Sequence, residues 1–112
     1  TSEAAKTGDA ANAVYSAGKA GLAALLRTIV REHGRDGIRA NCVAPGPIDT
    51  RLLRAAFPDQ ETADATIEKL VRLVPMRRLG QPEDVAAAVR YLVTEGAHVA
   101  GEHLSVGGGV VM

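Results

Sequence analysis

The segment Ile38–Pro47, with the sequence IRANCVAPGP, indicates the fold class. Its first seven residues, 38–44, form a short and mainly apolar run between turn-forming residues, which is typical of a buried parallel strand. Pro45 has no N–H to donate to a β ladder, and Gly46 permits backbone conformations that other residues avoid. We therefore predict a strand over residues 38–44 that ends where the prolines begin.

A long helix is predicted before this strand, over residues 13–33. Five apolar residues recur in it at helical spacing and predict one apolar face: Leu22, Leu25, Leu26, Ile29 and Val30. We expect Gly34 to end the helix, because glycine is common just past a helix C-terminus. The first half is rich in alanine and glycine. Since glycine costs up to about 1 kcal/mol inside a helix, we expect a backbone, another helix or a flat ligand to approach closely.

After the strand, the pattern predicts a helix over 60–74, a helix over 82–94 and a short strand over 103–107. Residues 1–12 are small and polar and are expected to form a surface loop. The order helix, strand, helix, helix, strand is typical of an α/β layered sheet. Parallel strands need neighbours and two covered faces, so two strands predict that most of the sheet lies outside this chain.

The composition is that of an ordinary soluble globular chain of 112 residues, one domain at most. Thirteen Lys and Arg balance 13 Asp and Glu, so nothing favours nucleic acid or an anionic membrane as a partner. The three histidines lack metal-ligand spacing, and no metal site is expected. The single cysteine, Cys42, excludes an intrachain disulfide and suits a reducing cytoplasm. The chain begins with Thr1 rather than methionine, so we expect it to be processed or incomplete.

Tyr15 and Lys19 are four residues apart in the predicted helix, and Ser2 precedes the tyrosine by thirteen positions. Residues at i and i+4 share a helix face about 5–6 Å apart at Cβ, so an ammonium group can lie beside a phenol. A free tyrosine has a pKa near ~10, and a fixed positive charge is the ordinary means of lowering it. The three residues predict an acid catalyst, its electrostatic partner and a hydroxyl that stabilises an oxyanion. A tyrosine and a lysine at this spacing also occur by chance in many helices, so the pair alone leaves both interpretations open.

Four stretches, taken together, carry a resemblance to a known family. They are Tyr15-Ser16-Ala17-Gly18-Lys19 with Ser2 upstream, Gly37–Asn41 running into Pro45–Thr50, Arg78–Ala86, and Ala100–Gly108. In this order and spacing the chain resembles the C-terminal part of a classical short-chain dehydrogenase/reductase (SDR), most like the 3-oxoacyl-[acyl-carrier-protein] reductases. The resemblance implies an α/β fold: the C-terminal part of a single doubly wound, parallel-sheet Rossmann domain, with its N-terminal half absent.

The resemblance also implies a role for each matching residue. Tyr15 would give or take the hydroxyl proton, Lys19 would bind the nicotinamide ribose and favour the phenolate, and Ser2 would bind the substrate oxygen. NAD or NADP, between which the sequence does not distinguish, would contact six positions: Tyr15, Lys19, Pro45, Gly46, Ile48 and Thr50. Residues from about 50 to 75 would form a lid over the substrate.

The activity implied is the interconversion of a carbonyl and a secondary alcohol by hydride transfer with the nicotinamide cofactor. The implied partners are a small carbonyl or alcohol substrate and, in the complete protein, further copies in a cytoplasmic dimer or tetramer. An extended-type sugar epimerase or dehydratase shares the Tyr-Lys pair. The compact ending soon after residues 78–86 fits the classical branch better.

Two departures limit what we expect of these residues by themselves. The family ordinarily has an aspartate where this chain has Gly107, which we expect to affect local anchoring rather than chemistry. No glycine-rich phosphate loop with a strand before it and a helix after it occurs in the sequence. We therefore expect a fragment that is inactive alone and lacks useful affinity for NAD(P)H. The alternative is a catalytically inactive truncated product or an oligomerisation module.

Overall fold

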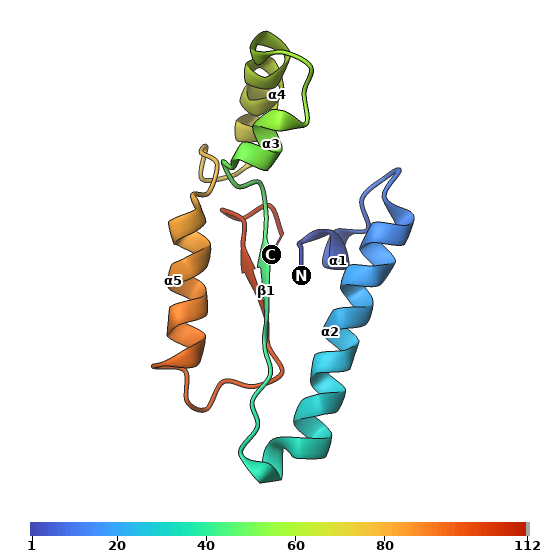
Figure 1. Ribbon diagram of the computed structural model, residues 1–112, viewed down its shortest axis with the longest axis vertical. Coiled ribbons are helices and arrows are strands. Elements are labelled where there is room, and N and C mark those ends of the chain that lie inside the picture. The colour runs from blue at the N-terminus through green and yellow to red at the C-terminus, as the bar shows by residue number, and fades with distance from the viewer. Residues whose placement is uncertain (112) are drawn as a thin grey trace.

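The computed structural model describes residues 1–111 (Figure 1). The elements follow in the order α1 (Ala4–Thr7), α2 (Ala13–His33), the 3₁₀ helix η1 (Gly34–Asp36), β1 (Cys42–Pro45), α3 (Arg51–Ala55), α4 (Gln60–Leu73), α5 (Pro82–Val93) and β2 (His103–Val106). Helices α2 and α5 flank the two strands, and α3 with α4 forms a lobe that projects from one end (Figure 1). Within this described part, no helix is long and apolar enough to cross a membrane.

The two strands pair in parallel, and Cys42 lies opposite His103 at the start of the register. The pairing continues beyond the strands, because the Gly46 N–H donates to the Val106 carbonyl at 3.1 Å. Farther along the chain, Ile48 forms an isolated parallel bridge with Gly80, two residues before α5 begins. A parallel pair requires a long crossover between its strands, and the lobe and α5 together form that crossover.

The core is small, and its buried apolar side chains come from every layer: Ala4, Ala23, Leu26, Ala44, Ala63, Val74, Leu79 and Leu92. On α2 the predicted apolar face is only partly covered, since Leu26 is 5% exposed but Leu25 is 54% exposed. The close approach expected at the glycines of α2 is not made within residues 1–111. A Cβ built at Gly18 or Gly21 meets no described atom within 4 Å.

Arg39 holds the end of α5 and the turn that follows it. Its Nη1 donates to the carbonyl oxygens of Leu92, Gly96 and Val99 at 2.8, 2.9 and 3.1 Å. The last carbonyl groups of a helix have no partner within the helix itself. A single guanidinium nitrogen therefore provides a hydrogen-bond donor for a carbonyl group in the last turn of α5 and for two carbonyl groups in the turn that follows.

The strand predicted over residues 38–44 is wrong at both ends, since β1 runs from Cys42 to Pro45. Asn41 does not pair with a strand. Its side chain bonds to the connection before β2, where it donates to the Val99 carbonyl at 2.9 Å and accepts from the Glu102 N–H at 3.0 Å. The ladder between the two strands begins only at Cys42, opposite His103 at the start of β2. Pro45 belongs to the strand because it pairs in register with Val106, even though it has no N–H to donate.

The long helices match the sequence pattern closely, because periodicity and capping residues act together. Helix α2 has the predicted bounds, and α4, α5 and β2 each end one residue before the predicted position. Asp59 caps α4 by accepting from the Thr62 N–H at 2.7 Å. At the start of α5, Asp84 accepts from the Gln81 N–H at 2.8 Å, which forms a capping box.

Two short helices were missed in the sequence. The predicted loop over residues 1–12 contains α1, and the segment after Thr50 contains α3, which Thr50 caps by accepting from the Leu53 N–H at 3.1 Å. Four or five residues are too few to show a helical period. Helix α2 ends at His33 with Gly34 as its C-cap, as expected, but Gly34 is right-handed and begins η1, and Gly37, with φ of 80°, is the left-handed residue.

We predict that Arg39→Lys lowers the free energy of unfolding by about 1–3 kcal/mol, the usual scale for hydrogen bonds made by a charged group. The lysine side chain is one bond shorter than that of arginine, so its ammonium does not reach the position of Arg39 Nη1, from which all three bonds are made. Urea denaturation followed by circular dichroism measures the change.

Arg35→Lys is the matched control, because the Arg35 side chain is 88% exposed. It should change the unfolding free energy by no more than about 0.5 kcal/mol. Equal effects of the two substitutions would contradict the role assigned to Arg39.

Candidate active site

Ser2 lies where the first residues of the chain run beside β1. The Thr1 nitrogen donates to the Val43 carbonyl at 3.0 Å, and the Glu3 N–H donates to the Pro45 carbonyl at 3.3 Å. Bonds from alternate residues of one segment to alternate residues of its neighbour are the pattern of a parallel ladder. Ser2 is thus held between two ladder bonds, just before α1 turns away from the sheet.

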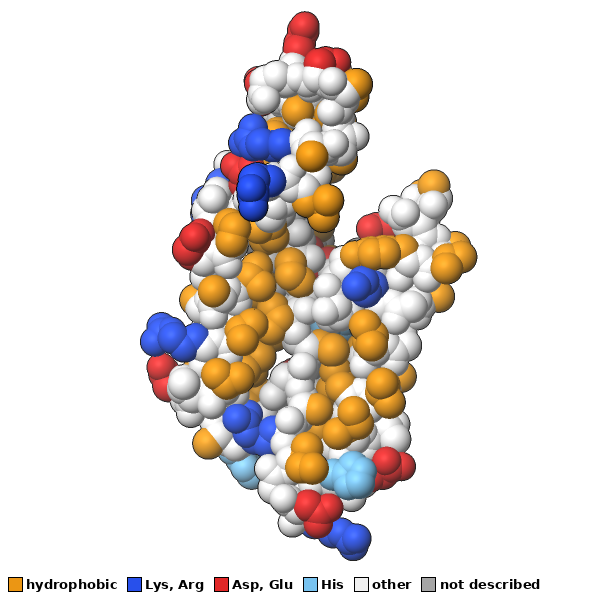
Figure 2. Space-filling view, in the orientation of Figure 1, with side chains coloured by type: hydrophobic (Ala, Val, Ile, Leu, Met, Phe, Trp, Pro, Cys, Tyr) orange, Lys and Arg blue, Asp and Glu red, His pale blue; other side chains and the backbone are white. Residues whose placement is uncertain are grey.

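Ser2 also lines a cleft of about 270 Å³, together with two other predicted site residues, Pro45 and Gly46. Figure 2 shows the molecule hollowed between the lobe of α3 and α4 and the start of α2. Ser2 Oγ accepts a bond from the Ala4 N–H at 3.3 Å. Its own proton is not used in that bond and is available to donate to a ligand oxygen.

Tyr15 and Lys19 lie one turn apart at the start of α2, as the i, i+4 spacing predicts. The Lys19 Nζ atom lies 5.3 Å from the centre of the Tyr15 ring, within cation–π range. Tyr15 is 50% exposed, so a ligand can reach it. Thr1 Oγ1 donates to the Lys19 carbonyl at 3.0 Å, which ties this part of α2 to the residue before Ser2.

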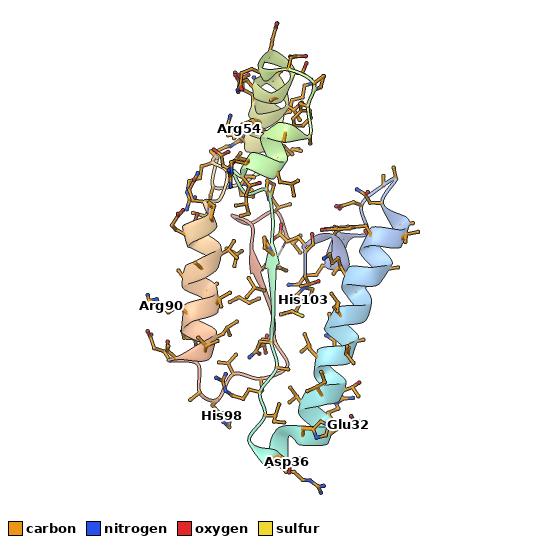
Figure 3. All side chains as sticks on the ribbon, in the orientation of Figure 1. Glu32, Asp36, Arg54, Arg90, His98 and His103 are labelled. Carbon is orange, nitrogen blue, oxygen red and sulfur yellow. The ribbon has the colours of Figure 1, made fainter. Side chains whose placement is uncertain are left out.

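The structure places Ile48 and Thr50 at the base of the lobe. Thr50 caps α3, and beside it Arg54 binds both carboxylate oxygens of Asp49 at 3.0 and 2.9 Å (Figure 3). The bonds from Arg54 hold the pKa of the Asp49 carboxyl below its usual range. Among residues 1–111, no side-chain hydrogen bond or ion pair joins Ile48 or Thr50 to Tyr15 or Lys19.

Position 46 requires glycine because a side chain would not fit there, and not because of its backbone conformation. Its φ is not in the left-handed region, contrary to the conformational role expected from the sequence. A Cβ at this position would lie 2.5 Å from Glu3 Oε2 and 2.7 Å from the Gly107 Cα. The approach of a nicotinamide to this backbone stays a prediction.

The sequence did not indicate a role for Glu3, although this residue lines the same cleft as Ser2. Its side chain is 5% exposed, and neither carboxylate oxygen has a hydrogen-bond partner in the described part of the chain. Burial raises the pKa of the Glu3 carboxyl, an effect that the positive charge of Lys6 opposes and the negative charge of Asp9 reinforces. A glutamate among small residues gives no periodic signal of burial, so the sequence alone does not reveal this group.

Across the described residues, no group of three or more His, Cys, Asp and Glu side chains is placed to bind a metal ion. Cys42 is half-buried with a free thiol. Burial lowers the pKa of His103, which lies on the side of the sheet facing α2 (Figure 3).

Comparison with known proteins identifies the family. A family model described as enoyl-(acyl carrier protein) reductase matches residues 1–111. The chain belongs to the short-chain dehydrogenase/reductase family. The four stretches that carried the resemblance all lie within the matched range, so the SDR prediction made from the residues is confirmed.

Curated relatives of the chain are similar over most of its length. It is 39% identical over 108 residues to (3R)-3-hydroxyacyl-CoA dehydrogenase of Canis lupus familiaris, covering 96% of this chain and 39% of that protein. It is 36% identical over 114 residues to 3-oxoacyl-[acyl-carrier-protein] reductase of Synechocystis sp., covering 100% of this chain and 42% of that protein. The SDR chain therefore spans about two fifths of the length of these relatives.

The fold comparison agrees with the family. A crystal structure described as an SDR glucose/ribitol dehydrogenase from Brucella melitensis matches with a TM-score of 0.86 and 30% identity. The match covers 100% of this chain and 43% of that one. The predicted fold class, a part of the SDR Rossmann-type α/β fold, is confirmed.

We predict that Glu3→Gln becomes more stable than the wild type as the pH rises above about 4.5, the ordinary pKa of a glutamate. A carboxyl whose pKa is raised on folding favours the folded state at low pH, and that contribution is lost as pH rises through the folded-state value. Glutamine keeps the shape of the protonated side chain and does not ionise. Thermal unfolding of both proteins across pH 3–8 measures the difference in melting temperature.

Glu95→Gln serves as the control, because Glu95 is exposed on the surface. Its stability difference from the wild type should stay nearly constant over the same pH range. A constant difference for Glu3→Gln as well would contradict burial of an ionisable Glu3.

Proposed function

We propose that the protein is a nicotinamide-dependent oxidoreductase of the SDR family that interconverts a carbonyl and a secondary alcohol. The observation that carries the proposal is the pairing of Tyr15 with Lys19 on one exposed helix face, tied through Thr1 to the Ser2 segment. The relatives named above, which are dehydrogenases and reductases, support the same class of reaction. By their names, these two relatives act on a 3-hydroxyacyl-CoA and on a 3-oxoacyl group bound to the acyl carrier protein.

The side chains present fit a nicotinamide cofactor and its substrate. NAD or NADP, when bound, supplies or accepts a hydride. Tyr15 gives a proton to, or takes one from, the substrate oxygen at its hydroxyl group. Ser2 donates its free hydroxyl proton to that oxygen and stabilises the negative charge that develops there. Lys19 provides an ammonium beside the tyrosine and a donor for a ribose hydroxyl.

The backbone around Pro45 and Gly46 forms one wall of the Ser2 cleft, and we assign it to the nicotinamide side of the site. Ile48 and Thr50 lie in the connection between this wall and the lobe, and we assign them to binding of the same cofactor. The lobe, residues from about 50 to 75, is the proposed substrate lid. The chain enters and leaves it at adjacent positions, where the Asp49 N–H donates to the Gly80 carbonyl at 2.8 Å.

A second candidate function is association without catalysis, as an inactive truncated product or an oligomerisation module. The observation that favours it is the uncovered apolar face of α2, where Val14 is 89% and Leu22 is 47% exposed. In the complete enzyme we assign this chain to one part of a single Rossmann domain in a dimer or tetramer. A cytoplasmic location stays a prediction.

We predict that Tyr15→Phe, in the protein as its gene encodes it, lowers kcat by about 10²–10⁴-fold, the usual contribution of a general acid or base. The cofactor Kd should remain nearly unchanged, because only the proton path is removed. Reduction of acetoacetyl-CoA, followed by NADPH or NADH absorbance, measures kcat, and fluorescence titration measures the Kd.

Tyr91→Phe is the matched control, since Tyr91 is 44% exposed on α5, remote in sequence from the proposed site. It should retain the wild-type rate. A Tyr15→Phe enzyme as fast as the wild type would refute the role assigned to Tyr15.

The 112-residue chain alone is predicted to show no saturable binding of NADH or NADPH at micromolar concentration. Dinucleotide binding draws on a glycine-rich turn at a helix N-terminus, and no such turn occurs in this sequence. Fluorescence titration of the purified, folded chain tests this. A saturable micromolar isotherm would contradict the prediction.

A further inference from the structure

The Glu3 carboxyl is a buried group to which the proposed reaction assigns no role. Its two oxygens have no hydrogen-bond partner within residues 1–111. The nearby Lys6 amine is bonded elsewhere, to Ser105 Oγ on β2 at 2.9 Å. An unpaired carboxyl is costly to bury, so its presence in a folded protein calls for an explanation.

The carboxyl fills a space beside two glycines, Gly46 and Gly107, at the ends of β1 and β2. A Cβ added at Gly107 would overlap both oxygens and the carboxyl carbon of Glu3. The backbone does not require glycine there. Gly108 and Gly109 have left-handed φ values of 65° and 90°, but Gly107 does not. The Glu3 side chain is therefore what excludes a side chain at position 107.

Glu3 also belongs to the segment that carries Ser2. Its N–H donates to the Pro45 carbonyl, and its side chain lies across Gly46 onto the end of β2. Three positions later, Lys6 reaches β2 as well, through Ser105. The segment that follows Ser2 is thus fastened to both strands. A tightly packed side chain restricts the backbone that carries it.

We propose that Glu3 and Gly107 form an exchanged pair. The family ordinarily has an aspartate where this chain has Gly107, and here the carboxyl that fills the end of the sheet comes from Glu3 in the Ser2 segment. Glu3 is then a positioning residue for Ser2. The proposal rests on the space that the two residues share, and it holds whether or not the proposed reaction is correct.

A double-mutant cycle in the protein as its gene encodes it tests the shared space. Gly107→Asp should lower the melting temperature by roughly 5 °C or more, since the new side chain meets a buried carboxyl. In the Glu3→Ala background, the same substitution should have little effect or raise the melting temperature, because the carboxyl that overlaps the added Cβ is then absent. Gly107→Ala, a smaller change, should show the same dependence on residue 3.

Gly21→Ala is the control, because its Cβ meets no described atom within 4 Å. It should shift the melting temperature equally in both backgrounds, as expected for independent sites. A Gly107→Asp effect that is equally large in both backgrounds would overturn the exchanged pair. A Gly107→Asp protein that folds only together with Glu3→Ala would support it.

Hydrogen exchange measured by NMR tests the positioning role without any assay of activity. Glu3→Ala should lower the protection of the residue 3 amide, which bonds to Pro45, by about tenfold or more, and Gly107→Asp should restore it. Amides within α5 should be unaffected by either change. Unchanged protection at residue 3 in Glu3→Ala, or an equal loss throughout the protein, would overturn the positioning role.

Discussion

The parallel pairing of β1 with β2 is the constraint on which the rest of the structure depends. It joins residues about sixty positions apart, and Pro45 and Gly46, which line the Ser2 cleft, lie at its end. The Ser2 segment extends the same ladder on the far side of β1 through two backbone bonds. Because each ladder bond specifies a register, the position of Ser2 relative to Gly46 follows from the pairing and does not depend on a flexible loop.

Arg39 shows how a short sheet is held closed at its other end. The guanidinium group connects the chain before β1 with the C-terminus of α5 and the turn that leads to β2. The sheet is therefore fastened at both ends by charged side chains, Arg39 at one end and Glu3 at the other. The first satisfies carbonyl groups, whereas the second fills space beside glycines. Their energetic consequences differ, because the Arg39 guanidinium donates to three carbonyl oxygens, whereas the Glu3 carboxyl has no hydrogen-bond partner within residues 1–111.

Much of the fold could be predicted from the sequence where periodicity and capping residues agree. Helix α2 has a clear apolar face, and α5 begins with Pro82 and two acids, so their positions followed from local physics. Helices α1 and α3 are too short to have a period, and the start of β1 depends on a partner sixty residues away. In the site, the Tyr15–Lys19 pair followed from helix geometry. The burial of Glu3 did not, because it arises only when distant glycines come together.

The bridge between Ile48 and Gly80 has a consequence for how this family member can vary. The chain leaves the sheet for the lobe and returns from it at adjacent positions, joined by backbone bonds. The intervening residues form a closed excursion whose two ends meet. Near its return the excursion also contacts the chain after β2, since the Met76 N–H donates to the Gly108 carbonyl at 3.1 Å. Changes confined to residues 51–73 leave both this contact and the bridge in place. The lobe is in this sense a transplantable module, which can be exchanged without altering the pairing of β1 with β2.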